Sequence, residues 1–247
     1  MIPMGNMPPF GKLVLAIGQL YHGGYFCGRI IDNGVEYNLF VSPKATGNTT
    51  LLAWGPISAG PVSTKNLTNG FQATADLYAA DGGSGSTHPA AVFCNDLTIG
   101  GYTDWYLPAR DELEIAFRAL KPLTDNNVTT EREKSAIAYT SNGNQDDVAG
   151  DTHGRDRSVG SGILGTAYTA GAPAQTSVVA FQTGQAEAFT TTHVSAEDYY
   201  MSSTEFSDGA AWCQVFGLGG TAVTGYQVSF AKNATNLSVR AFRRERA

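Results

Sequence analysis

The sequence contains few charged residues and few cysteines for its length. Asp, Glu, Lys and Arg together make up 15% of the 247 residues, whereas about a quarter is usual in soluble domains. The three cysteines, Cys27, Cys94 and Cys213, form no C-x-x-C pair, and an odd number of cysteines cannot all pair within one chain. A disulfide scaffold is therefore not expected.

Long hydrophobic runs are also missing. The apolar run from Leu13 to Ile17 covers five residues, follows two prolines and precedes no small-residue cleavage pattern. No segment approaches the roughly 20 apolar residues that a transmembrane helix needs. We therefore expect synthesis in a host cytoplasm and no membrane insertion. A protein of this kind that acts outside the cell leaves by another route, such as lysis.

The charge balance is acidic. The net charge is −6 and the pI is near 5.1, so a phosphate backbone is repelled unless a local basic patch compensates. The basic residues that cluster near the C-terminus are Arg240, Arg243, Arg244 and Arg246. We interpret them as salt-bridging and solvated side chains of a last strand, and we expect no nucleic acid as a partner.

Glycine, small polar residues and aromatic residues fill the composition instead. The 29 glycines indicate many turns and few long helices, and the aromatic share of 11% favours a β-sheet core or an exposed recognition surface. The composition therefore favours an all-β or α+β fold over a helical one.

The clearest local pattern is a β-hairpin between Tyr21 and Pro43. Apolar and polar residues alternate on both sides of Asp32-Asn33-Gly34, a sequence suited to the positive φ angles of a tight turn. Helices are expected at 71–80, 89–97 and 108–120. The third is the most strongly marked, because Leu113, Ala116, Phe117 and Leu120 form one apolar stripe that should pack against a sheet.

The remaining elements are short strands and one long loop. Strands are expected at 51–54, 178–182, 187–189, 199–203, 211–216, 226–231 and 237–242. Residues 142–177 are rich in small and acidic residues without periodicity, which predicts a long loop insertion.

Two separated stretches and the C-terminal segment carry a resemblance to a known family. They read GGYTDWYLPARDEL (100–113), YMSSTE (200–205) and LSVRAFRR (237–244). Together they resemble a group of bacterial and phage domains of unassigned function that is related to the C-terminal domain of a Legionella collagen-like adhesin. The resemblance covers roughly Phe71 to Arg244 and implies a C-type-lectin-like fold with mainly antiparallel short strands and two or three helices.

The N-terminal part has a looser resemblance of its own. Gly23 to Arg29, followed by the hairpin, looks like the leader of phage and prophage copies of this architecture. The chain is therefore expected to be α+β, with an N-terminal β-hairpin and attachment region at 1–70. A C-type-lectin-like domain is expected at 71–247, with its loop insertion near 142–177.

Most of the motif residues are expected to have structural roles, namely Trp105, Pro108, Glu112, Ser203, Glu205 and Arg240. Trp105 and Leu107 should fill the core before the third helix, and Glu205 and the hydroxyls of 202–204 should satisfy backbone groups. The family usually has Trp where this chain has Met201. It also has a Ser or Thr cap where this chain has Ala109, which should weaken the capping box with Glu112 by about 1 kcal/mol.

Ligand contacts in related lectin-like folds come from loops near the last strands. By that resemblance the candidate ligand-binding residues are Trp212, Tyr226, Asn233 and Asn236. Aromatic faces and amides suit stacking and hydrogen bonding with sugars or protein loops. The alternative is that Trp212 and Tyr226 are buried sheet residues.

A metal is possible at one place only. Asn142, Asn144, Asp146, Asp147 and Asp151 offer oxygen ligands at close spacing, so Asp146, Asp147 and Asp151 are calcium candidates. The segment lacks the glycine and the final glutamate of an EF-hand, and a solvated loop is the alternative. The four histidines are far apart in the sequence, so zinc is not expected.

Catalytic patterns are incomplete. Oxygenases that share the lectin-like fold use a cysteine pair, for which these cysteines have no matching spacing. The sequence Gly82-Gly83-Ser84-Gly85-Ser86 lacks the last glycine of a serine-hydrolase elbow. Residues 217–222 fit a dinucleotide fingerprint, but no helix pattern follows them. We therefore expect no enzyme, no catalytic residue and no cofactor apart from possible calcium.

Composition and resemblance together predict a phage tail-tip or tail-fibre receptor-binding protein, an adhesin for a glycan or protein receptor on the bacterial surface. Its expected location is the virion tail, its other partners are tail proteins, and it is expected to be a homo-oligomer, with a trimer as one candidate. The first alternative is a structural virion protein, such as a tail or capsid decoration. The second is a bacterial surface adhesin.

Overall fold

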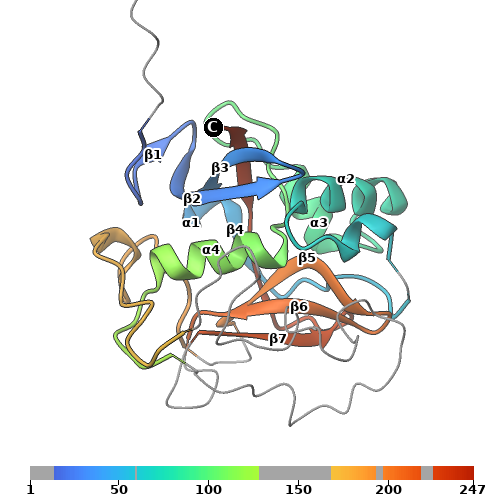
Figure 1. Cartoon of the computed structure of the whole chain (residues 1–247). Coiled ribbons are helices and arrows are strands. Elements are labelled where there is room, and N and C mark those ends of the chain that lie inside the picture. The colour runs from blue at the N-terminus through green and yellow to red at the C-terminus, as the bar shows by residue number, and fades with distance from the viewer. Residues whose placement is uncertain (1–13, 59, 128–167, 193–196, 218–224) are drawn as a thin grey trace, which may run out of the picture.

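The computed structural model describes residues 14–58, 60–127, 168–192, 197–217 and 225–247. Within these ranges the chain is α+β, with two sheets of mostly antiparallel strands and helices packed on and between them (Figure 1). This confirms the mixed fold class that the sequence predicts.

The first sheet joins the two ends of the chain. Its strand order is β1 (Leu20–Tyr21), β2 (Gly24–Asp32), β3 (Val35–Val41) and β9 (Phe242–Arg246). The predicted hairpin is β2–β3, and its turn residues Asn33 and Gly34 have positive φ. Because β3 pairs with β9 from Tyr37–Arg246 to Val41–Phe242, this sheet contains strands from both sides of the boundary expected at residue 70.

The second sheet has five strands. Its order is β4 (Asn48–Thr50), β8 (Ser238–Arg240), β5 (Tyr199–Ser207), β6 (Ala210–Val215) and β7 (Tyr226–Ala231). The strands predicted at 199–203, 211–216 and 226–231 are confirmed. The strand predicted at 237–242 is two strands in different sheets, because the chain crosses between the sheets at Ala241, which hydrogen-bonds to Ser42 and Gly47.

Three other strand predictions are wrong. The strand expected at 51–54 lies earlier, at Asn48–Thr50, and Leu51 with a φ of 67° ends it. Residues 178–182 instead contain a short 3-10 helix, Val179–Phe181, and residues 187–189 form no strand. Both runs pack against the core through Phe181 and Phe189, and neither pairs with any strand in the described ranges, so apolar character alone was misleading.

The three predicted helices are confirmed, with ends shifted by up to two residues, and a further short helix at Lys44–Gly47 was not predicted. The helices are α1 (Lys44–Gly47), α2 (Gly70–Asp81), α3 (Pro89–Asn95) and α4 (Arg110–Leu120), with a 3-10 turn η1 at Val62–Lys65. Helix α2 begins where the Asn69 side chain accepts a hydrogen bond from the Gln72 N–H, and ends at Gly82 with a φ of 71°.

Helix α4 lies between the two sheets rather than on the outside of one (Figure 1). Its apolar stripe is buried, and so are the charged side chains of Arg110, Asp111, Glu112 and Glu114. Burying such groups costs free energy unless they are paired. Arg110 Nε lies 3.1 Å from Asp111, and Arg118 Nε lies 2.9 Å from Glu114 Oε1, so part of this cost is offset within the helix.

Two large apolar clusters make up most of the core in the described ranges, beside two small ones. The first large cluster surrounds Trp54, Trp105 and Leu107, and the second surrounds Phe117 and Phe189. Trp105 is 1% exposed and Leu107 is fully buried, which confirms their expected place before α4. Met201 is 1% exposed and lies in the first cluster.

Candidate ligand-binding cavity

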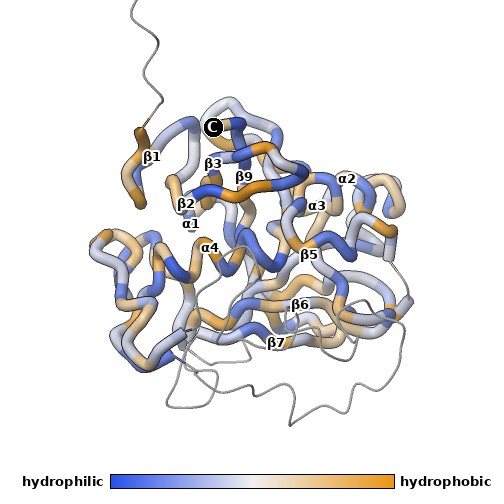
Figure 2. The backbone as a smooth tube through the Cα atoms, viewed as in Figure 1, coloured by the Kyte–Doolittle hydropathy of each residue, from blue (hydrophilic) through white to orange (hydrophobic). Residues whose placement is uncertain are grey.

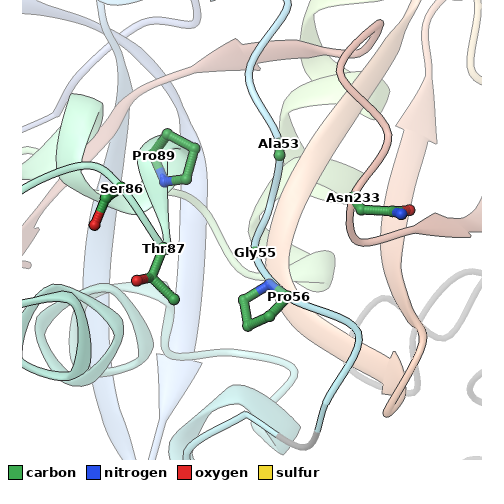
Figure 3. A pocket seen from close by; sticks show the side chains of 7 residues that line it. All are labelled: Ala53, Gly55, Pro56, Ser86, Thr87, Pro89 and Asn233. Carbon is green, nitrogen blue, oxygen red and sulfur yellow. The ribbon is translucent and has the colours of Figure 1, made fainter.

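A surface cavity of about 270 Å³ lies where three loop segments meet. The first is the chain after β4, the second is the turn between α2 and α3, and the third is the loop after β7 (Figure 3). The lining residues are Ala53, Gly55, Pro56, Ser86, Thr87, Pro89 and Asn233. No lining residue is charged, and the polar side chains among them carry hydroxyl or amide groups.

The loop after β7 holds the first wall in place. The backbone N–H groups of Trp54 and Gly55 donate to the carbonyl of Lys232 at 2.8 and 3.1 Å. The ammonium of Lys232 reaches back to the carbonyl of Ser58 at 2.7 Å and lies 4.6 Å from the centre of the Trp54 ring. Main-chain and side-chain contacts of one residue therefore fix residues 54–58.

Asp81 organises the second wall. Its Oδ1 accepts hydrogen bonds from the Gly85 N–H and the Ser84 hydroxyl, both at 2.7 Å. Its Oδ2 accepts from the N–H groups of Thr87 and His88, both at 2.6 Å. These donors favour the charged carboxylate and hold the pKa of Asp81 well below its usual range. The loop is therefore set by one carboxylate at the end of α2.

The two walls meet at the base of the cavity. The Ala90 N–H donates to the carbonyl of Ala53 at 3.3 Å, and the His88 ring packs edge-on against Trp54 with centroids 5.9 Å apart. A Cβ on Gly55 would lie 2.6 Å from His88 Cδ2, so only glycine allows this approach. Burial lowers the pKa of His88, and the ring is therefore mainly neutral at pH 7.

The structure separates the four predicted ligand residues. Asn233 is exposed and lines the cavity, and Asn236 is half-buried on the same loop without reaching it. Trp212 is fully buried against Phe206 and Arg110, and Tyr226 is 4% exposed with its hydroxyl 3.0 Å from that of Tyr199. The alternative therefore holds for Trp212 and Tyr226. Both are buried sheet residues, and packing covers the rings that were expected to contact a ligand.

The residues that the sequence missed are Ser86, Thr87 and Gly55. The Gly-Ser-Gly-Ser-Thr-His-Pro run at 83–89 predicted only a loop. One signal was present, namely Asp81 just before this run. An aspartate three to seven residues before a run of Gly, Ser and Thr can accept hydrogen bonds from several of their N–H groups. Its position beside Asn233 depends on chain segments about 150 residues apart, which no local pattern reveals.

The motif residues hold the scaffold beneath this cavity. Glu205 is 2% exposed and accepts hydrogen bonds from Lys232 Nζ at 2.7 Å, from Thr64 Oγ1 at 3.0 Å and from the Gly60 N–H. The carbonyl of Pro108 accepts from the Ser203 N–H at 2.7 Å. The expected structural roles of Glu205 and Pro108 are confirmed, and Glu205 also anchors the residue that supports the first wall.

The hydroxyls of 202–204 behave differently from one another. Ser202 Oγ donates to the Trp212 carbonyl at 2.8 Å, and Thr204 Oγ1 donates to the Asn66 carbonyl at 3.0 Å. The Ser203 hydroxyl is buried without a hydrogen-bond partner among the described residues. The predicted role therefore belongs to Ser202 and Thr204, and Ser203 contributes through its backbone.

Three of the C-terminal arginines, Arg240, Arg243 and Arg244, form ion pairs, as predicted. Arg240 is fully buried and donates to the Ser42 carbonyl and to Glu187, at distances of 2.7 to 3.0 Å. Its guanidinium also lies 5.0 Å from the centre of the Phe189 ring. Arg240 thus ties β8 to the residue that follows β3 and to the segment after the 3-10 helix.

The described ranges contain neither a metal-binding cluster nor an exposed cysteine. No group of three or more His, Cys, Asp or Glu in them could hold a metal ion. The calcium candidates Asp146, Asp147 and Asp151 lie outside the described residues. Cys27, Cys94 and Cys213 are free and buried, and burial raises the pKa of each thiol, which disfavours the reactive thiolate.

No described helix combines the length and the apolar character needed to cross a membrane. Comparison with known proteins adds no assignment. No protein-family model matches the chain, and no curated protein matches it significantly.

Proposed function

We propose that the protein is a receptor-binding component of a phage tail, built on a C-type-lectin-like fold, and that the cavity around Asn233 contacts the bacterial surface ligand. The observation that carries the proposal is a preformed cavity lined by Ser86, Thr87 and Asn233. Three separate hydrogen-bonded supports fix its walls before any ligand arrives. Preorganisation of this kind reduces the entropic cost of binding.

The chemistry of the lining favours a neutral, polar ligand such as the glycan part of a surface polymer. Ser86 and Thr87 present hydroxyls and Asn233 presents an amide, all of which can both donate and accept hydrogen bonds. Pro56 and Pro89 add rigid apolar surface. The proposed role is binding without catalysis, since the lining contains no acid, base or nucleophilic thiol.

The test is binding of the purified protein to intact cells of candidate hosts, with and without calcium chelation. Two variants, Asn233→Ala and Thr87→Ala, remove polar groups from the cavity, and Thr235→Ala on the same loop is the matched control. We expect saturable binding by the wild type. The affinity should fall about tenfold or more in each cavity variant, because each loses its side-chain hydrogen bonds to the ligand, and it should stay unchanged in the control. Equal binding by all four proteins contradicts the assignment of the cavity.

An assembly role is the second candidate, and one observation favours it. Val14, Ile17 and Leu20 are 84%, 40% and 58% exposed, and they lie together at the β1 edge of the first sheet, where Figure 2 shows an apolar segment at the border of the fold. Exposed apolar groups at a sheet edge are typical of contact surfaces. We propose that this edge docks to a further copy of the chain or to another tail protein.

Sedimentation of the wild-type protein and of a Val14→Ser/Leu20→Ser variant tests the assembly role. We expect the wild type to form an oligomer that the variant loses while it remains folded. If the wild type is a monomer and still binds cells, receptor binding stands as the function. Self-assembly through this edge is then ruled out.

A further inference from the structure

A second cavity, of about 220 Å³, lies away from the first, at the junction of the hairpin, the last strand and α2. It is lined by Tyr37 of β3, Phe71 of α2, Arg244 of β9 and Asp104 of the loop before α4. None of these side chains lines the first cavity, and the structural roles expected for Trp105, Glu112 and Glu205 do not involve them. The set combines two aromatic rings, a guanidinium and a carboxylate.

Arg244 is held in a fixed position within this cavity. Its guanidinium carbon lies 4.4 Å from the centre of the Tyr37 ring and 5.8 Å from that of Phe71. Its Nη1 donates to Asp32 Oδ2 at 3.2 Å. Asp32 is itself buried and fixed by the side chains of Asn69, at 2.8 Å, and Thr68, at 3.1 Å. The guanidinium is therefore preorganised rather than mobile.

The same contacts leave two residues that line the cavity with hydrogen-bonding groups that have no partner in the described part of the chain. Among the described residues Arg244 donates only to Asp32, so its Nε and Nη2 remain available. Asp104 accepts from Arg243 Nε through Oδ1 at 2.6 Å, and its side chain is 40% exposed, so Oδ2 remains available as an acceptor. A charged donor pair and a charged acceptor thus stand at one site, and hydrogen bonds to charged groups are the stronger ones.

The local charge argues for a neutral ligand. The guanidinium of Arg244 is paired with Asp32, and that of Arg243 with Asp104 and Glu245 at 2.6 and 3.2 Å. Three carboxylates therefore surround two guanidinium groups, so a carboxylated or phosphorylated ligand gains no net attraction. A neutral ligand with neighbouring hydroxyls can accept from Arg244 and donate to Asp104.

The aromatic surface supplies the remaining contact. Phe71 is 43% exposed although it is a large apolar residue, and its ring packs edge-on against Tyr106 with centroids 5.9 Å apart, which fixes its orientation. An exposed ring suits the apolar C–H face of a sugar. The volume is below the roughly 300–1,000 Å³ of pockets that enclose drug-sized ligands, so one sugar ring fits better than a longer chain.

We propose that this second cavity is a binding site for a single neutral sugar ring, with Arg244 and Asp104 bound to adjacent hydroxyls and Phe71 stacked on the ring. The site is independent of the cavity around Asn233 and does not require the receptor-binding role. Residues from α2, β3, β9 and the loop before α4 all contribute to it.

Saturation-transfer-difference NMR with the methyl glycosides of glucose, galactose and mannose, and with galacturonate as the charged probe, tests the proposal. We expect at least one neutral glycoside to bind and galacturonate to bind more weakly. Arg244→Lys keeps the charge but loses the planar fork, and it should weaken binding by about tenfold or more. Phe71→Ala and Asp104→Asn should weaken it as well.

Matched controls are Arg246→Lys on the same strand, Val179→Ala at another exposed apolar position, and Asp76→Asn on α2, none of which lines the cavity. If Arg244→Lys fails to fold, the other two variants decide, because Phe71 and Asp104 are exposed. No binding of any neutral glycoside, stronger binding of galacturonate, or binding unaffected by Phe71→Ala and Asp104→Asn overturns the proposal. Asn233→Ala should leave this binding unchanged, so either site can fail without the other.

Discussion

The hydroxyl of Thr204 in β5 accepts a hydrogen bond from the backbone N–H of Arg110 at 3.0 Å and so caps the N-terminus of α4 from a neighbouring strand. The cap residue itself is Ala109, which has no acceptor in its side chain. Glu112 still supplies its half of the capping box, since its Oε2 accepts from the Ala109 N–H at 2.7 Å. The weakening that the sequence predicts at Ala109 is therefore offset by a contact 94 residues away.

Thr204→Val should destabilise the protein by about 2 kcal/mol. The variant leaves the buried Arg110 N–H without an acceptor and also removes the hydrogen bond from Thr204 Oγ1 to the Asn66 carbonyl. Chemical denaturation measures the change in the free energy of unfolding. Thr235→Val, at an exposed loop position, should change it by less than about 0.5 kcal/mol, and equal effects would argue against the cap.

Glu112 should make stability depend on pH. Burial raises the pKa of its carboxyl from 4.5 to about 7, so the folded state binds the proton more tightly than the unfolded state. The resulting stabilisation is full below about pH 4.5 and is lost as the pH rises to 7, by about 3 kcal/mol.

Glu112→Gln should therefore remove this part of the pH dependence, because the amide keeps an acceptor for the Ala109 N–H and cannot ionise. Denaturation at pH 5 and pH 8 gives the comparison. Glu36→Gln, whose side chain is 38% exposed, should retain the wild-type slope. An unchanged slope in Glu112→Gln would show that the buried carboxyl does not titrate in this range.

The ion pair between Lys232 and Glu205 should be strongly coupled. Their side chains are 0% and 2% exposed and lie 2.7 Å apart. Lys232→Met leaves a buried carboxylate without its cation and should cost about 3–5 kcal/mol. A double-mutant cycle with Glu205→Gln measures the coupling. The double variant should lose less stability than the sum of the single losses, and strict additivity contradicts the pairing.

Asp81→Asn should loosen the loop at 84–88 while leaving the rest of the fold intact. The amide nitrogen cannot accept hydrogen bonds, so two of the donors that now converge on the carboxylate lose their acceptor. Amide hydrogen exchange should become faster at Gly85, Thr87 and His88. Asp76→Asn, in the same helix, is the control, and unaltered exchange in Asp81→Asn would show that the loop is held by other contacts.

Local patterns predicted the elements that depend on neighbours in the sequence. The turn at Asn33-Gly34, the apolar stripe of α4 and the strand at 226–231 each follow from residues close together in the sequence, and all three are confirmed. The predictions that failed concerned partners. The runs at 178–182 and 187–189 contain apolar residues as strands do, but neither pairs with a strand in the described part of the chain, and the pattern contains no information on pairing.

The candidate site shows the same limit. Asn233 was predicted from its loop near the last strands, and it lines the cavity. Trp212 was predicted from the suitability of its ring for stacking, yet β5 and α4 cover it, because an aromatic side chain gains more from burial than from exposure. Asp104 and Arg244 were noted only as motif and ion-pairing residues, and their place in one cavity depends on the contact of β9 with the loop before α4.

By itself the sequence determined the mixed fold class, the positions of the three longer helices and the scaffold role of the motif from Trp105 to Glu112, because these depend on local geometry and on the free energy of burying apolar side chains. Only the tertiary structure decided that the two ends of the chain share one sheet, that α4 lies between the sheets, and which polar groups remain at the surface. Strand pairing and burial depend on contacts between segments far apart in the chain. Several segments could pair with the same partner, and a local sequence pattern does not show which of them does.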